Sequence, residues 1–208
     1  MSRCSMNYVT CHIGYPSTKY TIEVLAADYV LPRIRECVKT DSESVSFVTH
    51  SLGGIIVRYI RKTVPEMNFG RVVMLGPPNH GSELVDNLGG WRIFQWVNGP
   101  AGQQLGANQE SVPNKPGAAT FEVGIIAGNK PFLEPFKSYI TGQSDGKVSV
   151  ESAKLEHMSD YVILPVTHSL MMRNKAVIEQ TLSLLKHGHF TGAATATLVR
   201  PTSAGTAR

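Results

Sequence analysis

Short runs of β-branched residues alternate with segments of helical periodicity through residues 7–75. The predicted elements are, in order, a strand at 7–13, a helix at 20–39 with a kink at Pro32, a strand at 44–49, a helix at 52–63 and a strand at 71–75. A helix between consecutive strands returns the chain to the same edge of a sheet, so this alternation predicts parallel βαβ units. We therefore expect an α/β fold, a doubly wound and mostly parallel sheet with helices on both faces.

The alternation is interrupted and then resumes. Further strands are predicted at 120–127, 138–141 and 161–165, and a last helix at 171–186. Residues 84–119 contain Trp91 and Trp96 and end in a stretch rich in Gly, Pro and Asn. They predict either a cap in which the two tryptophans bind substrate or a helix that packs on its own domain. Residues 191–208 are mostly Thr, Ala, Gly and Ser, which predicts a tail outside a domain at 1–190.

The composition argues against several classes of protein. The 208 residues are 42% hydrophobic, which is enough apolar side chain for a core and excludes a disordered chain. No stretch supplies the ~20 apolar residues needed to cross a bilayer, so we expect a soluble protein. The first seven residues lack the apolar core of a signal peptide, so we expect a cytoplasmic location. The 20 basic residues are scattered, so nucleic acid is not an expected partner. Cys4, Cys11 and Cys37 have no zinc-ligand spacing, which predicts free thiols and no metal.

Residues 47–54, Phe-Val-Thr-His-Ser-Leu-Gly-Gly, place Ser51 where a predicted strand turns directly into a predicted helix. In a nucleophile elbow the serine occupies a strained turn that lifts its hydroxyl above the sheet, and small residues are required two positions to either side. Gly53 meets this demand, whereas Thr49 stands in place of the usual glycine and should crowd the turn. An ordinary loop serine fits the Gly-Gly pair less well. Ser51 is therefore the predicted nucleophile.

A serine at neutral pH needs a base, and the base needs a third group to orient it. In this architecture the acid and then the histidine follow the serine along the chain. His168 comes after the strand predicted at 161–165, at the carboxyl end where open α/β sheets build their sites. His157 precedes that strand, and His187 and His189 follow the last helix. His168 is therefore the predicted base.

The acid is sought among the carboxylates between the serine and the histidine. Asp145 lies in a loop directly after the strand predicted at 138–141, on the same rim as the predicted nucleophile and base. Asp160 would begin a strand at the opposite end of the sheet, which suits a capping or surface group, and Asp86 is a further candidate. The alternative for Asp145 is an ordinary Asp-Gly turn. We expect Asp145 to be the acid.

Several separate segments resemble the lipase-like bacterial α/β-hydrolases. The matching segments are residues 49–54 (their GHSLGG elbow), 75–82 (their LGTPxxGS segment), 145–150 (their acid loop), 167–171 (their histidine loop) and 15–17 (the turn before the first helix). They follow the expected order through about residues 7–190. The resemblance implies hydrolysis of carboxylic esters without a metal or an organic cofactor.

The N-terminus departs from the family pattern. Family members carry an earlier strand that ends in a His-Gly turn, whose backbone N–H completes the oxyanion hole. Only six residues precede Asn7, and His12 is followed by Ile13, so this sequence lacks that strand or has reorganised it. The backbone N–H of Leu52 is expected to be one oxyanion donor, and the second donor is not identified. An unpaired sheet edge at the N-terminal strand, with self-association through it, is also expected.

The expected function is hydrolysis of carboxylic esters through an acyl-enzyme, with a small-molecule ester that carries an apolar acyl chain as substrate. Two alternatives stay open. One is a related hydrolase of thioesters, lysophospholipids or amides, since one triad serves all of them. The other is a weak or inactive member that keeps the triad as a scaffold.

Overall fold

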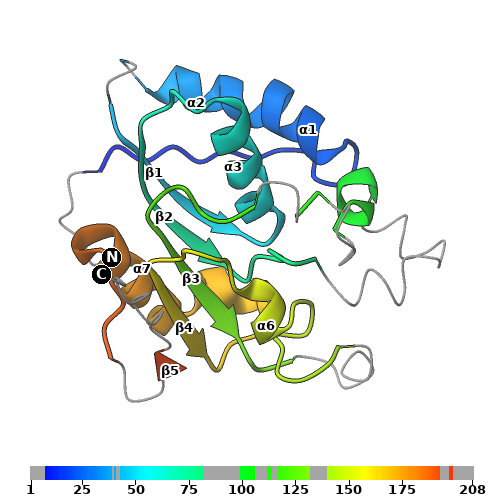
Figure 1. The fold of residues 1–208 in the computed structure, drawn as a ribbon, viewed down its shortest axis with the longest axis vertical. Helices are drawn as coiled ribbons and strands as arrows, with labels where there is room; N and C mark the ends of the chain where they lie inside the picture. The colour runs from blue at the N-terminus through cyan, green and yellow to red at the C-terminus, as the bar shows by residue number, and fades with distance from the viewer. Residues whose placement is uncertain are drawn as a thin grey trace, which may run out of the picture.

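The computed structural model describes residues 8–38, 40, 43–81, 99–105, 112–113, 117–131, 140–192 and 197–198 (Figure 1). In this part of the chain, five strands form one sheet in the order β1 (Val45–His50), β2 (Phe69–Leu75), β3 (Val123–Gly128), β4 (Asp160–Leu164) and β5 (Thr197–Leu198). The first four strands are parallel and β5 is antiparallel to β4. The predicted α/β fold with a mostly parallel sheet is thus confirmed.

Helices lie on both faces of the sheet (Figure 1). They are α1 (Ile22–Val24), the π-helical η1 (Leu25–Val30), α2 (Leu31–Cys37), α3 (Leu52–Thr63), α6 (Val150–Ala153), the 3₁₀-helical η3 (His168–Arg173) and α7 (Lys175–His187). In β2, Met74 packs with Val57 of α3, whereas Leu75 belongs to the core cluster that contains Leu184 of α7. Successive side chains of a strand point to opposite faces, so α3 and α7 cover different faces of the sheet. This is the doubly wound arrangement that the sequence predicts.

The first helix is widened where the sequence predicts a kink. The π-helical turn η1 precedes Pro32, and the backbone N–H of Leu31 bonds to the carbonyl of Ala26, five residues earlier. Proline has no N–H to donate, and its ring clashes with the carbonyl four residues before it. The extra residue in the turn accommodates this local conflict, as π-bulges commonly do.

The N-terminal strand predicted at 7–13 does not form. Residues 8–13 are extended but belong to no strand, and side chains hold them: the Tyr8 hydroxyl donates to the Leu185 carbonyl, and Cys11 is disulfide-bonded to Cys37, with Cα atoms 6.3 Å apart. The β-branched run predicts an extended backbone, but pairing also requires a partner strand within reach. Among the described residues β1 is therefore the sheet edge, and the prediction that these two cysteines are free is wrong.

The disulfide also bears on the compartment. Such bonds persist in oxidising compartments and are rare in cytosolic proteins, so the Cys11–Cys37 bond weighs against the cytoplasmic location expected from the sequence. No helix among the described residues has the length and apolar character to span a membrane.

The segment predicted as a cap lies mostly outside the described residues, and with it Trp91 and Trp96. Its described part includes a helical turn at 99–103, and Ala101 is buried in the cluster formed by α1, η1, α2 and α3. The side chain of Gln104 accepts a hydrogen bond from the backbone N–H of Ile22 at 2.7 Å, at the start of α1. This part of the segment therefore packs on its own domain.

Three more predictions differ from the structure. Of the strand predicted at 138–141, residues 138–139 lie outside the described part, and residues 140–141 form no strand. Within the predicted tail, Thr197 and Leu198 form β5 and pair with β4. The last helix divides at Asn174, whose side chain accepts hydrogen bonds from the first backbone N–H groups of α7 and so begins a new helix.

A buried arginine joins α3 to the loop that follows β2. Arg58 is 4% exposed and donates to the carbonyl and side-chain oxygens of Asn79 at 3.2 and 3.1 Å, and to the Gly117 carbonyl at 2.8 Å. The Asn79 amide in turn donates to the Ala153 carbonyl at 2.9 Å. Burial lowers the pKa of Arg58 to about 10, which leaves it charged at neutral pH. This network fixes the segment that follows the carboxyl end of β2.

Candidate active site

Ser51 sits in a strained turn between β1 and α3. Its backbone angles are φ 52° and ψ −121°, a conformation that residues other than glycine rarely adopt. The backbone N–H of Ser51 donates to the Leu75 carbonyl at 2.9 Å, which fastens the turn to the end of β2. The sharp turn places the serine directly beyond the carboxyl end of β1, as a nucleophile elbow does.

Close packing around the turn explains why position 53 is a glycine. A Cβ on Gly53 would lie 3.3 Å from the Cβ of Thr49 and 3.4 Å from the hydroxyl of Tyr15. These are tight contacts, and one of them comes from the threonine that replaces the usual glycine. Thr49 therefore lies close to position 53, and a side chain there would require its neighbours to shift by a few tenths of an ångström.

Asp145 and His168 form a buried pair at the edge of the sheet where Ser51 lies. The Nδ1 atom of His168 is 2.7 Å from Oδ2 of Asp145, and the two residues are 4% and 2% exposed. A carboxylate oxygen accepts a hydrogen bond, so Nδ1 carries the proton and Nε2 is left as the basic nitrogen of the neutral ring. The geometry thus selects one tautomer of His168.

The loop around Asp145 fixes the carboxylate. Its Oδ1 atom accepts the backbone N–H groups of Lys147 and Val148, both at 2.9 Å, and its carbonyl accepts the backbone N–H of His168 at 3.0 Å. Hydrogen bonds to an ionised carboxylate are among the stronger ones in proteins. The two bonds to Oδ1 therefore fix the carboxylate within its own loop, and the bond from the His168 N–H joins that loop to the histidine loop, in addition to the side-chain pair.

Two glycines at strand ends provide the space for this pair. Gly76 follows β2 with φ +52°, and a Cβ there would lie 2.8 Å from Oδ2 of Asp145 and 3.2 Å from Nδ1 of His168. Gly128 ends β3, and a Cβ there would lie 2.8 Å from the Cβ of Asp145. The pair therefore sits directly over the carboxyl ends of β2 and β3. Neither glycine was predicted to have a role in the site, although a glycine at the end of a strand was the available signal.

His50, the residue before Ser51, contacts the predicted base. Its ring centroid is 4.7 Å from that of His168, and its Nε2 atom is 3.0 Å from the His168 carbonyl oxygen. Burial and the nearby His168 lower the pKa of His50 to about 4. His50 is therefore neutral at neutral pH. No role was predicted for His50 from the sequence.

The lowered pKa of His50 predicts an acid-sensitive contribution to stability. An unfolded histidine takes up a proton at about pH 6.5, whereas folded His50 resists it down to about pH 4. Between these values the unfolded state binds more protons, so stability falls as the pH falls. We expect His50→Gln, which does not titrate, to lose less melting temperature than the parent over this interval. Equal losses in thermal unfolding at matched pH values would contradict the buried, neutral state of His50.

The other sequence candidates lie elsewhere. His157, His187 and His189 are exposed, and Asp86 is outside the described residues. Asp160 is buried at the start of β4, where it accepts the backbone N–H groups of two residues, Tyr161 at 2.9 Å and Phe190 at 2.7 Å. Of the two roles predicted for it, capping or surface group, the buried position excludes the second, and Asp160 caps backbone N–H groups.

Ser51 and His168, the predicted nucleophile and base, both follow the carboxyl ends of parallel strands at one edge of the sheet. The backbone N–H of Ser51 donates to Leu75, the residue before Gly76, and Ser51 follows His50, whose ring contacts that of His168. No hydrogen bond between the Ser51 hydroxyl and His168 is present among the described residues. Catalytic hydrogen bonds of ligand-free enzymes are often long and tighten only when substrate binds.

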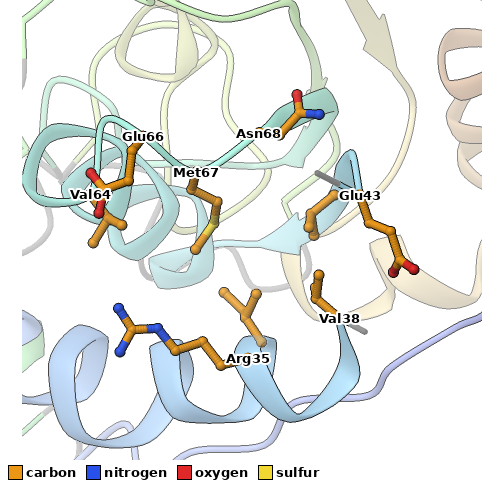
Figure 2. A pocket seen from close by; sticks show the side chains of 9 residues that line it. Arg35, Val38, Glu43, Val64, Glu66, Met67 and Asn68 are labelled. Carbon is orange, nitrogen blue, oxygen red and sulfur yellow. The ribbon is translucent and has the colours of Figure 1, made fainter. Parts of the chain in front are cut away.

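Two of the cavities among the described residues lie at opposite ends of β1. The larger, about 500 Å³, opens between α2 and the loop from α3 to β2, as Figure 2 shows. Its lining residues are Ile34, Arg35, Val38, Glu43, Val45, Val64, Glu66, Met67 and Asn68. Since Val45 is the first residue of β1, this cavity lies at the amino end of the strand, opposite to Ser51.

The smaller cavity, about 230 Å³, adjoins the elbow. Its lining residues are Val48, Thr49, His50, Leu75, Met172, Val177, Ile178, Thr181 and Leu182. Most of this lining is apolar. In the described part of the chain, no group of three or more His, Cys, Asp or Glu residues is arranged to hold a metal ion.

The fold resembles those of a solved lipase, in two forms, and of a phospholipase. The mature form of Bacillus licheniformis lipase BlEst2 matches with a TM-score of 0.64 and 19% identity, over 82% of this chain and 76% of that one. Its propeptide form matches with a TM-score of 0.56 and 20% identity, over 74% and 38% of the two chains. Phospholipase PlaB from Legionella pneumophila, in complex with thio-NAD, matches with a TM-score of 0.57 and 18% identity, over 79% and 48%.

No family model and no curated protein matches the sequence. At identities near one fifth, structural similarity establishes the fold and leaves activity to be argued from the site. The chain has the α/β fold of this lipase and this phospholipase, as the resemblance of its motifs to lipase-like α/β-hydrolases predicted.

Proposed function

We propose that the protein is a serine hydrolase that cleaves carboxylic esters, with Ser51 as nucleophile, His168 as base and Asp145 as the orienting acid. The observation that carries the proposal is the strained backbone of Ser51 at the carboxyl end of β1, on the edge where His168 and Asp145 are paired at 2.7 Å. A serine in such a conformation has a structural cost, and strain of this kind concentrates at functional sites.

The proposed reaction follows from the tautomer of His168. Its Nε2 atom takes the proton of the Ser51 hydroxyl as the serine oxygen attacks the ester carbonyl. Asp145 stabilises the imidazolium that forms. When the tetrahedral intermediate collapses, Nε2 delivers the proton to the leaving alcohol, and an acyl-enzyme remains. A water molecule, activated by the same nitrogen, then attacks the acyl group and regenerates the serine.

The developing oxyanion needs hydrogen-bond donors. Leu52 is the first residue of α3, and the first backbone N–H groups of a helix have no partner within it and lie at the positive end of its dipole. Its N–H therefore suits the role of one donor. The second donor is not assigned.

The apolar cavity beside the elbow supports an acyl chain as the substrate group. Val48, Leu75 and Ile178 line it together with Thr49 and His50, the residues that lead into Ser51. The lipase and the phospholipase that share the fold are consistent with this class of substrate. A thioester or lysophospholipid substrate would use the same triad, so substrate comparison must decide between them.

Two measurements test the function. The parent protein should hydrolyse p-nitrophenyl esters and react with a fluorophosphonate at Ser51, and a panel of oxyesters and thioesters of matched chain length should favour the oxyesters. Preference for the thioesters would change the substrate class while keeping the mechanism. A folded protein that neither labels nor turns over any of these substrates would be an inactive scaffold.

Self-association is expected through the sheet edge at β1 rather than at residues 8–13. In the described part of the chain β1 pairs with β2 alone, so one side of its backbone is open to another strand. We expect concentration-dependent dimers in light scattering. Ser46→Lys, an exposed change on β1, should weaken them, whereas Ser17→Lys, the same change in an exposed turn, should not. A protein that stays monomeric at all concentrations would contradict this expectation.

A further inference from the structure

His50 connects the strand of the nucleophile to the loop of the base. Its Nε2 atom is 3.0 Å from the His168 carbonyl oxygen, and its ring lies against the His168 ring with centroids 4.7 Å apart and an interplanar angle of 46°. A carbonyl oxygen can only accept a hydrogen bond, so Nε2 of His50 carries a proton and donates it. His50 therefore contacts His168 twice, once at the backbone and once at the face of the ring.

We propose that His50 is a positioning residue that sets the orientation of His168 toward Ser51, an inference that rests on the function proposed above. His50 precedes Ser51 in the chain, so any rotation of the His168 loop relative to the elbow must break the hydrogen bond or the ring contact. The two contacts thus fix the geometry between base and nucleophile.

Asp145 makes two further polar contacts with His168. Asp145 accepts its Nδ1–H at 2.7 Å and its backbone N–H at 3.0 Å. Both contacts hold His168 to the acid loop, and neither connects it to β1. Since acyl transfer needs the basic nitrogen within hydrogen-bond reach of the serine hydroxyl, a separate tie to β1 is required for that distance. His50 provides it.

The donor in this position must also be uncharged. His168 becomes positive when it takes the serine proton, and a second cation against its ring would oppose that charge. The charged groups that act on His50 besides His168 are Asp145 and Lys147, which have opposite signs. Burial is the larger influence and keeps His50 neutral, so it donates a hydrogen bond without adding charge.

Two substitutions separate the hydrogen bond from the ring contact. His50→Gln keeps an uncharged N–H donor of similar reach, and His50→Phe keeps the ring but has no donor. Misplacement of a catalytic group by about 1 Å can reduce rates by ~10²-fold. We expect His50→Phe to lower kcat about tenfold or more on a p-nitrophenyl ester, with KM little changed, and His50→Gln to recover most of that loss.

The same substitutions at exposed His187 are the matched controls, and thermal unfolding of each variant shows whether it is folded. A merely structural role would lower stability without the fall in kcat, or would affect kcat and KM in the same way in both variants. Parent-like kcat in folded His50→Phe would overturn the positioning role alone. Absence of both turnover and Ser51 labelling in the parent protein would overturn the proposed function and this inference with it.

Discussion

Ser51→Ala is expected to abolish ester hydrolysis while the protein stays folded. Loss of a serine nucleophile removes the covalent route, and in serine proteases such a change lowers kcat by up to ~10⁶-fold. We expect a loss of about 10⁴-fold or more here, measured on a p-nitrophenyl ester, with no labelling by a fluorophosphonate. Thermal unfolding should change little, because no side chain larger than the parent's enters the tight turn beside Gly53 and Thr49.

The control for this change is a serine on the same strand. Ser46 is exposed on β1, so Ser46→Ala makes the same chemical change away from the elbow and should keep parent activity. If Ser51→Ala retains more than a few per cent of the parent rate, another group is the nucleophile. The strained backbone of Ser51 would then need a different explanation.

The helix after Ser51 and the parallel strands of the sheet could be predicted from local sequence patterns. The helix expected at 52–63 is α3 with the same bounds, because the elbow starts it and Pro65 follows its end. Runs of β-branched residues predict the parallel strands β1 to β4. The order of strands and helices then requires parallel pairing, so placing Ser51 and His168 at one edge needed no knowledge of distances.

The N-terminal segment shows where local patterns fail. Residues 8–13 have the composition of a strand, but strand formation depends on a neighbour that the composition does not encode. The Cys11–Cys37 bond links positions 26 residues apart, and no spacing rule predicts a single pairing among three cysteines. Tertiary contacts decide the conformation there.

The supporting residues of the site were missed for the same reason. His50 and His168 are 118 positions apart in the chain, and their contact becomes visible only in three dimensions. Gly76 is required because Asp145 and His168 lie above it, and these residues approach it from two distant loops. Motifs identify the reacting groups, whereas the residues that orient those groups depend on how the motifs are brought together.

His168→Ala should reduce activity about as much as Ser51→Ala, because the members of a triad act as a unit. The expected loss is again about 10⁴-fold or more in kcat, measured on the same ester. His157→Ala and His187→Ala, at exposed histidines, should remain active and serve as controls. Activity that survives His168→Ala and disappears in either control would assign the base to another histidine.

Asp145→Asn tests the tautomer that the structure assigns to His168. The backbone N–H groups of Lys147 and Val148 both donate to Oδ1, so the amide oxygen of the asparagine must face them and its NH₂ group must face Nδ1 of His168. A donor in that place moves the ring proton to Nε2, the nitrogen that should accept the serine proton. We expect a folded variant with kcat reduced by about 10³- to 10⁴-fold, somewhat less than in His168→Ala. Near-parent turnover in Asp145→Asn would mean that His168 does not depend on this carboxylate, since no other arrangement of the amide satisfies both backbone donors.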